Sequence, residues 1–283
     1  MSNVDIPNEV DLTGGKRGVV GRVDVPGGEL AYEERGSGLP VVFVHSAGAD
    51  RGMWRPTIGL LHDRYRCIAV DLFGFGDSSV PTSRFSDFRA LLALCASLRL
   101  EKPILAGNSL GGLTVLNAAI IEPTVPAGLV LLAAFAGGWT YSAELVEATT
   151  KLRTIAADQG ADEALEAEID LWLYNGRDPS AIAPETRSYV RSARRNSAEK
   201  NIDHTLREPM ESLSMLDRVS VPTAIAIGEH DFDDFTQIGR LLQAGIRDST
   251  LMTVAAGHFI PLEAPDVVAE MIDDVAARAT LHG

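Results

Sequence analysis

Short apolar runs without polar alternation recur along most of the chain and give the first indication of its fold. Such runs, rich in Val and Ile, are typical of strands that are buried on both faces of a parallel sheet. They occur at Pro40–Val44, Cys67–Val70, Pro103–Ala106, Leu129–Ala133, Thr223–Ile227 and Leu251–Val254. Two further strand-like runs, Val19–Val25 and Leu30–Glu34, flank Pro26-Gly27-Gly28, an arrangement that predicts a hairpin.

Helical periodicity separates several of these runs. The clearest examples are Phe88–Leu98, Leu110–Ile121 and Pro265–Ala279. Alternation of buried strands with helices is the sequence form of a doubly wound α/β sheet. The pattern therefore predicts an α/β fold whose mostly parallel, eight-stranded sheet is flanked by helices.

One stretch interrupts this alternation. From Trp139 to about Thr205 there are only helix-like segments, at Glu144–Ala157, Asp162–Tyr174 and Pro184–Arg195. Some sixty residues of helix are too many for one crossover between strands, so we predict an inserted helical cap over residues 139–205. The core is then formed by residues 19–138 and 206–283, and residues 1–18, which lack periodicity, are expected to be a flexible leader.

Charge and composition exclude several classes of partner. The chain carries 25 Lys and Arg against 39 Asp and Glu, a formal net charge of −14. Such a field repels nucleic acids and anionic membranes, so neither is an expected partner. The acidic N-terminus has no signal-peptide pattern, and Cys67 and Cys95 lie in apolar runs. We therefore expect a soluble, cytoplasmic protein with two reduced core cysteines.

No motif points to a bound cofactor. The nucleotide-binding patterns G-x-G-x-x-G and G-x-x-x-x-G-K-[ST] do not occur, and no two histidines have metal-ligand spacing. We expect chemistry without a cofactor and without a metal.

The strongest functional signal is Gly107-Asn108-Ser109-Leu110-Gly111, which satisfies G-x-S-x-G. It lies between a predicted strand and a predicted helix, where that motif forms a sharp turn with an exposed serine. Glycines are needed because the turn leaves no room for side chains against the neighbouring backbone. The motif predicts that Ser109 is a nucleophile, with the Leu110 amide as one donor to an oxyanion.

Two further segments follow Ser109 in the order of a Ser-Asp-His triad, and a third segment precedes it. Asp231 comes shortly after the strand Thr223–Ile227, and His258 comes shortly after the strand Leu251–Val254. After the strand Pro40–Val44, the Ala47 amide is expected to be the second oxyanion donor. We predict that Ser109, Asp231 and His258 are catalytic, that His45 orients the oxyanion loop, and that Asp233 and Asp234 lie farther into a loop as solvated carboxylates.

Together these segments resemble the α/β-hydrolase-fold serine hydrolases from about Val19 to Ala279. Asp71-Leu-Phe-Gly-Phe-Gly-Asp-Ser78 is similar to that family's D-x-x-G-x-G-x-S turn. His45-Ser46-Ala47-Gly48, with Ser46 in second place, resembles the β-ketoadipate enol-lactonases, whereas Asn108 is similar to the hydrolases that cleave carbon–carbon bonds of ring-cleavage products. The resemblance implies the α/β-hydrolase fold with an inserted cap and places Ser46 and Asn108 in the substrate pocket.

The predicted cap offers two further sets of candidates. Arg187, Arg191 and Arg195 share one helix face, with Arg194 beside them; this is either a solvated face or a clamp for a substrate carboxylate. Its aromatic residues either line the pocket or form the core of the cap. These are Trp139, Tyr141, Trp172 and Tyr174, of which Trp139 and Trp172 are our substrate-binding candidates.

These observations favour a serine hydrolase that cleaves a small carboxylic ester or lactone through an acyl-enzyme. Carbon–carbon bond hydrolysis of a diketone and, more weakly, perhydrolysis are alternative reactions of the same residues. A small-molecule receptor with little turnover is the alternative from another class. The expected partner is a small-molecule substrate, and a homo-oligomer is compatible with the sequence.

Overall fold

A computed structural model of the chain describes residues 18–281. The predicted leader, residues 1–18, lies outside the described part except for Gly18. Eight strands form one sheet in the order β1-β2-β4-β3-β5-β6-β7-β8. β1 and β2 form the predicted hairpin, β2 pairs antiparallel with β4, and the remaining neighbours are parallel. The eight-stranded, mostly parallel sheet is thereby confirmed.

The strands closely follow the apolar runs of the sequence. They are β1 (Val19–Val25), β2 (Gly28–Arg35), β3 (Leu39–Val44), β4 (Tyr65–Val70), β5 (Ile104–Asn108), β6 (Gly128–Leu132), β7 (Thr223–Gly228) and β8 (Ser249–Val254). β5, β6 and β7 are buried along their whole length. This is the expected environment of parallel strands with helices on both faces.

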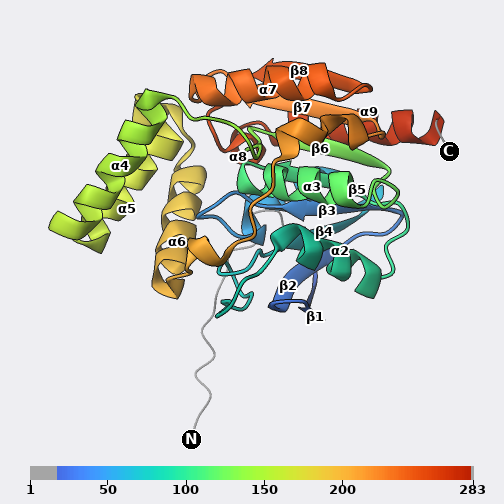
Figure 1. The fold of residues 1–283 in the computed structure, drawn as a ribbon, viewed down its shortest axis with the longest axis horizontal. Helices are drawn as coiled ribbons and strands as arrows, with labels where there is room; N and C mark the ends of the chain where they lie inside the picture. Colours follow the sequence, from blue (N-terminus) through green and yellow to red (C-terminus); the bar gives the residue numbers. More distant parts are fainter. Residues whose placement is uncertain (1–17, 282–283) are drawn as a thin grey trace, which may run out of the picture.

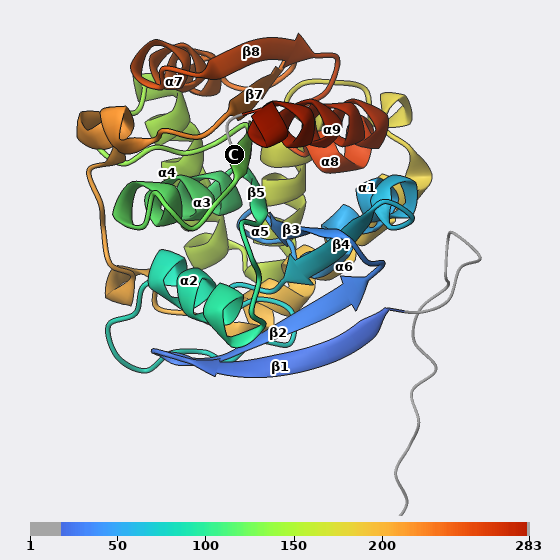
Figure 2. The same ribbon diagram turned by 90° about the vertical axis from the view of Figure 1, so that its right-hand side faces the viewer.

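Helices cover both faces of the sheet (Figure 2). One face carries α2 (Asp87–Ser97), α3 (Leu110–Ile121) and α7 (Asp233–Gly245), and the other carries α1 (Arg55–Leu61), α8 (Ile260–Glu263) and α9 (Pro265–Leu281). Each face of the sheet has its own apolar cluster. Within residues 18–281, no helix combines the length and the apolar content needed to cross a bilayer.

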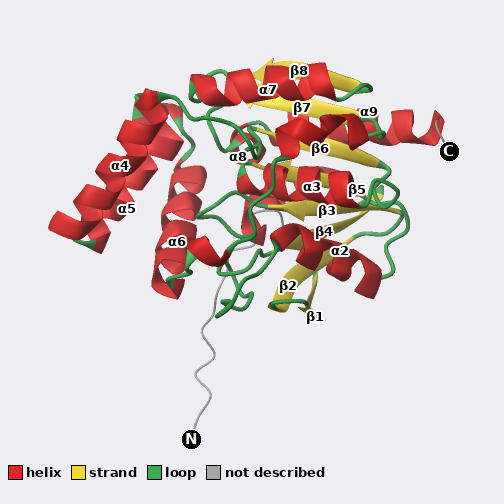
Figure 3. Cartoon of the chain, viewed as in Figure 1, coloured by secondary structure: helices red, strands yellow, loops and turns green. Residues whose placement is uncertain are grey.

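Within the long connection from β6 to β7, residues 139–205 lie at one end of the sheet and contain helices and loops but no strand (Figures 1 and 3). This stretch comprises α4 (Ala143–Asp158), α5 (Ala161–Ile169), the π-helical turn η2 (Asp170–Tyr174), the short 3₁₀ helix η3 (Pro179–Ala181), α6 (Pro184–Lys200) and the 3₁₀ helix η4 (His204–Leu206). The 3₁₀ helices η1 (Arg51–Trp54) and η5 (Ser212–Arg218) lie outside it. We call residues 139–205 the cap segment.

Asp234 connects the beginning of the cap segment to helix α7. Its carboxylate accepts hydrogen bonds from Trp139 Nε1 at 2.9 Å, from the Ser142 amide at 2.8 Å and from Ser142 Oγ at 2.6 Å. Burial alone would raise the pKa of Asp234, but the hydrogen bonds from Ser142 and Trp139 outweigh it and lower that pKa. The predicted placement of Asp234 in a solvated loop is therefore wrong, because it lies buried in the first turn of α7.

His45 joins the loop after β3 to the loop after β4. The imidazole is fully buried; its Nδ1 lies 2.8 Å from the Ser46 carbonyl oxygen, and its Nε2 accepts a hydrogen bond from the Leu72 amide at 2.9 Å. This pattern requires the neutral tautomer with the proton on Nδ1. These two contacts tie the loop that carries Ala47 to the loop after β4, and the orienting role of His45 stays a prediction.

The Asp71–Ser78 motif contacts the end of the loop after β3, at Arg51. The Asp71 carboxylate accepts hydrogen bonds from the Arg51 amide at 2.6 Å and the Asp77 amide at 2.8 Å, and it pairs with the Arg51 guanidinium. Gly76 has φ 45°, and a Cβ there would lie 2.1 Å from Asp71 Oδ2. Glycine is needed because the carboxylate occupies the space of a side chain.

We predict that Asp234→Ala lowers the free energy of unfolding by about 3 kcal/mol, because the buried donors of Trp139 and Ser142 lose their acceptor. Urea denaturation of the purified protein measures this. Asp233→Ala is the matched control, since the exposed neighbouring carboxylate accepts only a side-chain bond from Gln237. Equal losses in the two variants would contradict the role given to Asp234.

We predict that His45 makes the protein less stable below about pH 6.5. Burial lowers the pKa of His45, although Asp71 acts in the opposite direction. The unfolded chain then binds a proton near pH 6.5 that the folded protein does not bind. The His45 contribution is therefore complete above that pH and is lost as the pH falls, by at most about 1.4 kcal/mol per pH unit.

This pH dependence is tested by urea denaturation of the wild type and of His45→Gln at pH 7.5, 6.5 and 5.5. These values lie roughly one unit apart and span the ordinary pKa of His. The wild type should lose stability more steeply than the variant over this range. Parallel pH profiles would contradict the assignment of the titration to His45.

Candidate active site

Ser109 lies on a strained turn between β5 and α3. Its backbone has φ 55° and ψ −112°, a region that non-glycine residues rarely occupy. A Cβ at Gly111 would lie 2.0 Å from the Val44 carbonyl oxygen, so only glycine lets α3 approach β3 this closely. The turn places Ser109 at the carboxyl edge of the sheet, where its residue is 1% exposed.

Asp231 and His258 come together at the same edge. His258 Nδ1 lies 2.7 Å from Asp231 Oδ2, and the two side chains are 5% and 2% exposed, respectively. The loops that carry them are joined by backbone bonds from Glu229 to Val254 at 2.8 Å and from His230 to Ala256 at 3.0 Å. This geometry can hold the imidazole with its Nε2 available to act as a base.

Asn108 connects the serine turn to the histidine loop. Its Nδ2 donates to the His258 carbonyl oxygen at 3.1 Å, and its Oδ1 is buried without a hydrogen-bond partner among residues 18–281. The sequence placed Asn108 in the substrate pocket. Its amide nitrogen instead has a structural partner, and only its oxygen remains unpaired.

The two predicted oxyanion donors, Leu110 and Ala47, follow the neighbouring parallel strands β5 and β3. Leu110 opens α3, and the first amides of a helix have no intrahelical acceptor. Ala47 lies in a turn closed by a bond from the Ala49 amide to the Ser46 carbonyl at 3.1 Å, with Gly48 at φ 73°. That turn uses the Ala49 amide rather than the Ala47 amide.

Aromatic rings surround His258. The ring centroids of Phe235 and Trp172 lie 4.6 and 4.8 Å from the imidazole, and those of Phe259 and Phe135 lie at 5.8 and 6.4 Å. Trp172 belongs to the cap segment, so the structure brings this predicted residue to the site. Trp139 differs, because it packs in the other apolar cluster and its indole N–H is bonded to Asp234.

The arginines of α6 differ in their exposure and in their ion-pair partners. Arg191 and Arg195 pair with Glu166 and Asp162 of α5. Arg194 is 7% exposed, and burial lowers its pKa although Glu168 opposes the shift. Its Nη1 lies 2.7 Å from Glu168 Oε2, and its Nε is buried without a hydrogen-bond partner in the described part of the chain.

Arg194 lies directly over the loop between β3 and η1, residues 45–50, which carries Ala47. A Cβ at Gly48 would come within 2.9 Å of Arg194 Nη1, and the guanidinium carbon lies 5.6 Å from the centre of the Phe259 ring. Tyr189 of the same helix donates to Asp50 Oδ1 at 2.9 Å. Helix α6 therefore contacts the loop that carries Ala47, which no periodicity in the sequence indicated.

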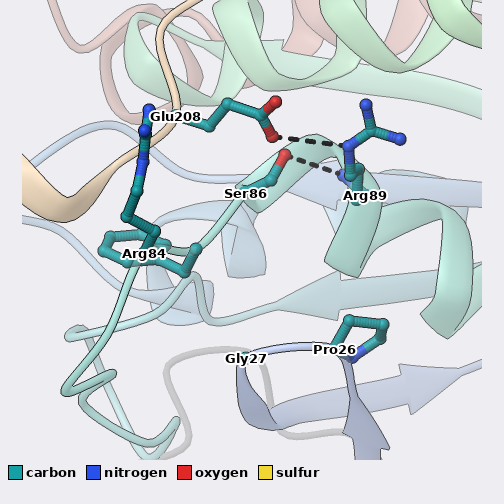
Figure 4. Close-up of a pocket in the computed structure, with 7 residues that line it drawn as sticks. Pro26, Gly27, Arg84, Ser86, Arg89 and Glu208 are labelled. Carbon is teal, nitrogen blue, oxygen red and sulfur yellow. Dashed lines mark hydrogen bonds and ion pairs between the residues drawn. The ribbon is translucent and has the colours of Figure 1, made fainter.

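A surface hollow of about 400 Å³ lies elsewhere on the molecule (Figure 4). It is bounded by the hairpin residues Pro26 and Gly27 and by charged side chains, among them Arg89, whose Nε lies 3.3 Å from Glu208 Oε2. None of the predicted site residues lines it, so it is distinct from the Ser109 site.

Several characterised proteins resemble this chain. It is 26% identical over 244 residues to 3-oxoadipate enol-lactonase 1 of Acinetobacter baylyi, which covers 80% of this chain and 84% of that protein. It is 33% identical over 117 residues to the 2-hydroxy-6-oxo-6-(2'-aminophenyl)hexa-2,4-dienoic acid hydrolase of Metapseudomonas resinovorans. That match spans 39% of this chain and 40% of the relative, less than half of its length.

Solved structures and a family model give the same assignment. A thermophilic esterase of Thermogutta terrifontis, solved with malate bound, superposes with a TM-score of 0.75 at 26% identity, covering 92% of this chain and 99% of the esterase. A sequence model of the alpha/beta hydrolase family matches residues 41–271, a range that includes Ser109, Asp231 and His258. With most of its length matched, the chain belongs to the alpha/beta hydrolase family.

Proposed function

We propose that this protein is a cofactor-independent serine hydrolase that cleaves a small carboxylic ester or lactone. The observation that carries the proposal is the 2.7 Å contact between His258 Nδ1 and Asp231, formed at the sheet edge where the strained turn holds Ser109. The names of two similar proteins, an enol-lactonase and an esterase, support the same reaction class.

In the proposed reaction, Ser109 Oγ attacks the substrate carbonyl while His258 Nε2 accepts the serine proton. The Ala47 and Leu110 amides donate to the oxyanion, and His258 then protonates the leaving oxygen. Water, deprotonated by His258, hydrolyses the acyl-enzyme and restores Ser109. Asp231 keeps the proton on Nδ1 and stabilises the imidazolium that forms in each half-reaction.

Carbon–carbon bond hydrolysis is the second candidate. Asn108 next to the nucleophile favours it, and so does the name of the dienoic acid hydrolase similar to this chain. Asn108 Nδ2 is bonded to the His258 carbonyl, which leaves only its Oδ1 for a substrate. Parallel assays with p-nitrophenyl esters, lactones and ring-cleavage diketones separate the two reactions. Binding without turnover of any of them would favour the receptor alternative.

We predict that Ser109→Ala lowers kcat on the best ester or lactone by roughly 10⁴-fold or more, because no other group replaces the nucleophile. Steady-state kinetics measures the loss, and thermal unfolding of the variant should remain close to that of the wild type. The assignment fails if the variant keeps more than about a tenth of the wild-type activity. That outcome would mean that the activation free energy rises by less than ~1.4 kcal/mol.

We further propose that the substrate carries a carboxylate, which Arg194 binds. The guanidinium is buried over the loop that carries Ala47, and its Nε has no hydrogen-bond partner among the residues that the structure describes. A buried cation with an unused donor is suited to a carboxylate. The names of two similar proteins refer to oxoadipate and to a dienoic acid, and the esterase of Thermogutta terrifontis was solved with malate bound; all three molecules are carboxylates.

We predict that Arg194→Met raises KM for a carboxylate-bearing ester by about 10- to 100-fold, because a charge-assisted hydrogen bond is lost. The KM for the corresponding neutral ester should change by less than about threefold, which corresponds to a change in binding free energy below about 1 kcal/mol. Arg195→Met is the matched control, since the exposed Arg195 lies next to it on the same helix. Equal effects on both esters would show that Arg194 acts through its packing on Phe259 instead.

A further inference from the structure

One short piece of the cap segment contacts both loops of the acid–base pair. This piece, residues 172–177, is here called the cap turn; it includes the end of the π-helical turn η2 and the residues that follow. Trp172 packs its ring 4.8 Å from the His258 ring. Asn175 has φ 44° and donates from Nδ2 to the His230 carbonyl at 2.9 Å, one residue before Asp231.

Arg177 and Glu263 form a bidentate ion pair between the cap turn and the end of helix α8, which directly follows the loop of His258. Arg177 Nη1 lies 2.5 Å from Glu263 Oε2, and Nη2 lies 3.2 Å from Oε1. The side chains are 14% and 10% exposed, so solvent screens the pair only in part. Glu263 Oε1 also accepts the Gly257 amide at 3.1 Å, next to His258.

The same arginine holds the cap turn itself together. Arg177 Nη2 donates to the Leu173 carbonyl at 2.6 Å, and Nε donates to the Tyr174 carbonyl at 3.2 Å. These carbonyls lie at the end of a helical turn, where intrahelical donors are lacking. One guanidinium thus joins the piece that carries Trp172 to the carboxylate that holds the Gly257 amide.

We propose that the cap turn positions the acid–base pair, through Asn175 on the loop of Asp231 and through Arg177 and Glu263 on the loop of His258. The proposal rests on the proposed function in that the Asp231–His258 pair is taken as catalytic. Arg177, Asn175 and Glu263 are positioning residues, since they act through the loops. The cap segment then contributes to the speed of the chemical step as well as to the choice of substrate.

The test is Glu263→Gln, which keeps the size of the side chain and removes the charge that pairs with Arg177. We expect kcat to fall by about 10- to 100-fold, because small displacements of reacting groups have effects of this size. KM should stay within about threefold for short and long acyl groups alike, since the lost interaction does not touch the substrate. Glu34→Gln is the matched control, because Glu34 forms a bidentate pair with Arg66 between β2 and β4.

A second readout does not depend on turnover. The downfield proton resonance of His258 Nδ1–H, assigned by its loss in His258→Ala, reports the bond to Asp231. We expect it to broaden and to exchange faster with water in Glu263→Gln, and to be unchanged in Glu34→Gln. Asn175→Gly, which retains the left-handed backbone at that position, should weaken the resonance and lower kcat by about three- to tenfold.

The outcomes separate the two proposals. If wild-type protein turns over no substrate of the panel while the resonance changes as expected, the proposed function fails and the positioning role stands. If wild-type protein is active and both Glu263→Gln and Asn175→Gly keep its kcat and its resonance, the positioning role is overturned. A reduced melting temperature with unchanged kcat and resonance would likewise overturn it, because the residues would then be structural only.

Discussion

The backbone of Ser109 is the constraint on which the rest of the site depends. Its conformation costs about 1–3 kcal/mol and persists only where the surrounding structure leaves no alternative. Here the Ser109 amide donates to the Leu132 carbonyl at 2.9 Å, and its carbonyl accepts the Leu113 and Phe135 amides at 3.0 and 3.2 Å. Close packing of Gly111 on Val44 then sets the distance between the serine turn and the loop of Ala47.

A second constraint is that the buried polar groups around Ser109 need hydrogen-bond partners. His258 and Ser109 are almost fully buried, and buried polar groups are costly unless they are hydrogen-bonded. The core satisfies part of this need through Asp231, His45 and Asn108. The cap segment bonds the neighbouring loops, through Asn175 on the His230 carbonyl and Arg177 on Glu263, so that the loops at the sheet edge and the cap turn over them are connected.

The cap segment contacts this edge in three separate places. Its beginning is bonded to Asp234 of α7, its cap turn lies on the loops of Asp231 and His258, and α6 lies on the loop that carries Ala47. In a chain with a net charge of −14, two of these contacts use arginines, the partly buried Arg177 and the buried Arg194. Their positive charges are local, and each pairs with a glutamate, Glu263 and Glu168 respectively.

The sequence by itself determined the sheet, its flanking helices and the residues at the strand ends. Uninterrupted apolar runs are stable where both of their faces are buried. The glycines of G-x-S-x-G indicate where two backbones approach each other closely. Tertiary structure alone decided what Asp234, Arg177, Glu263 and Arg194 do. Charged residues on helices give the same local pattern whether they face water or a buried partner. Their roles depend on contacts across 86 positions for Arg177 and Glu263, and across 92 for Ser142 and Asp234, which local periodicity does not encode.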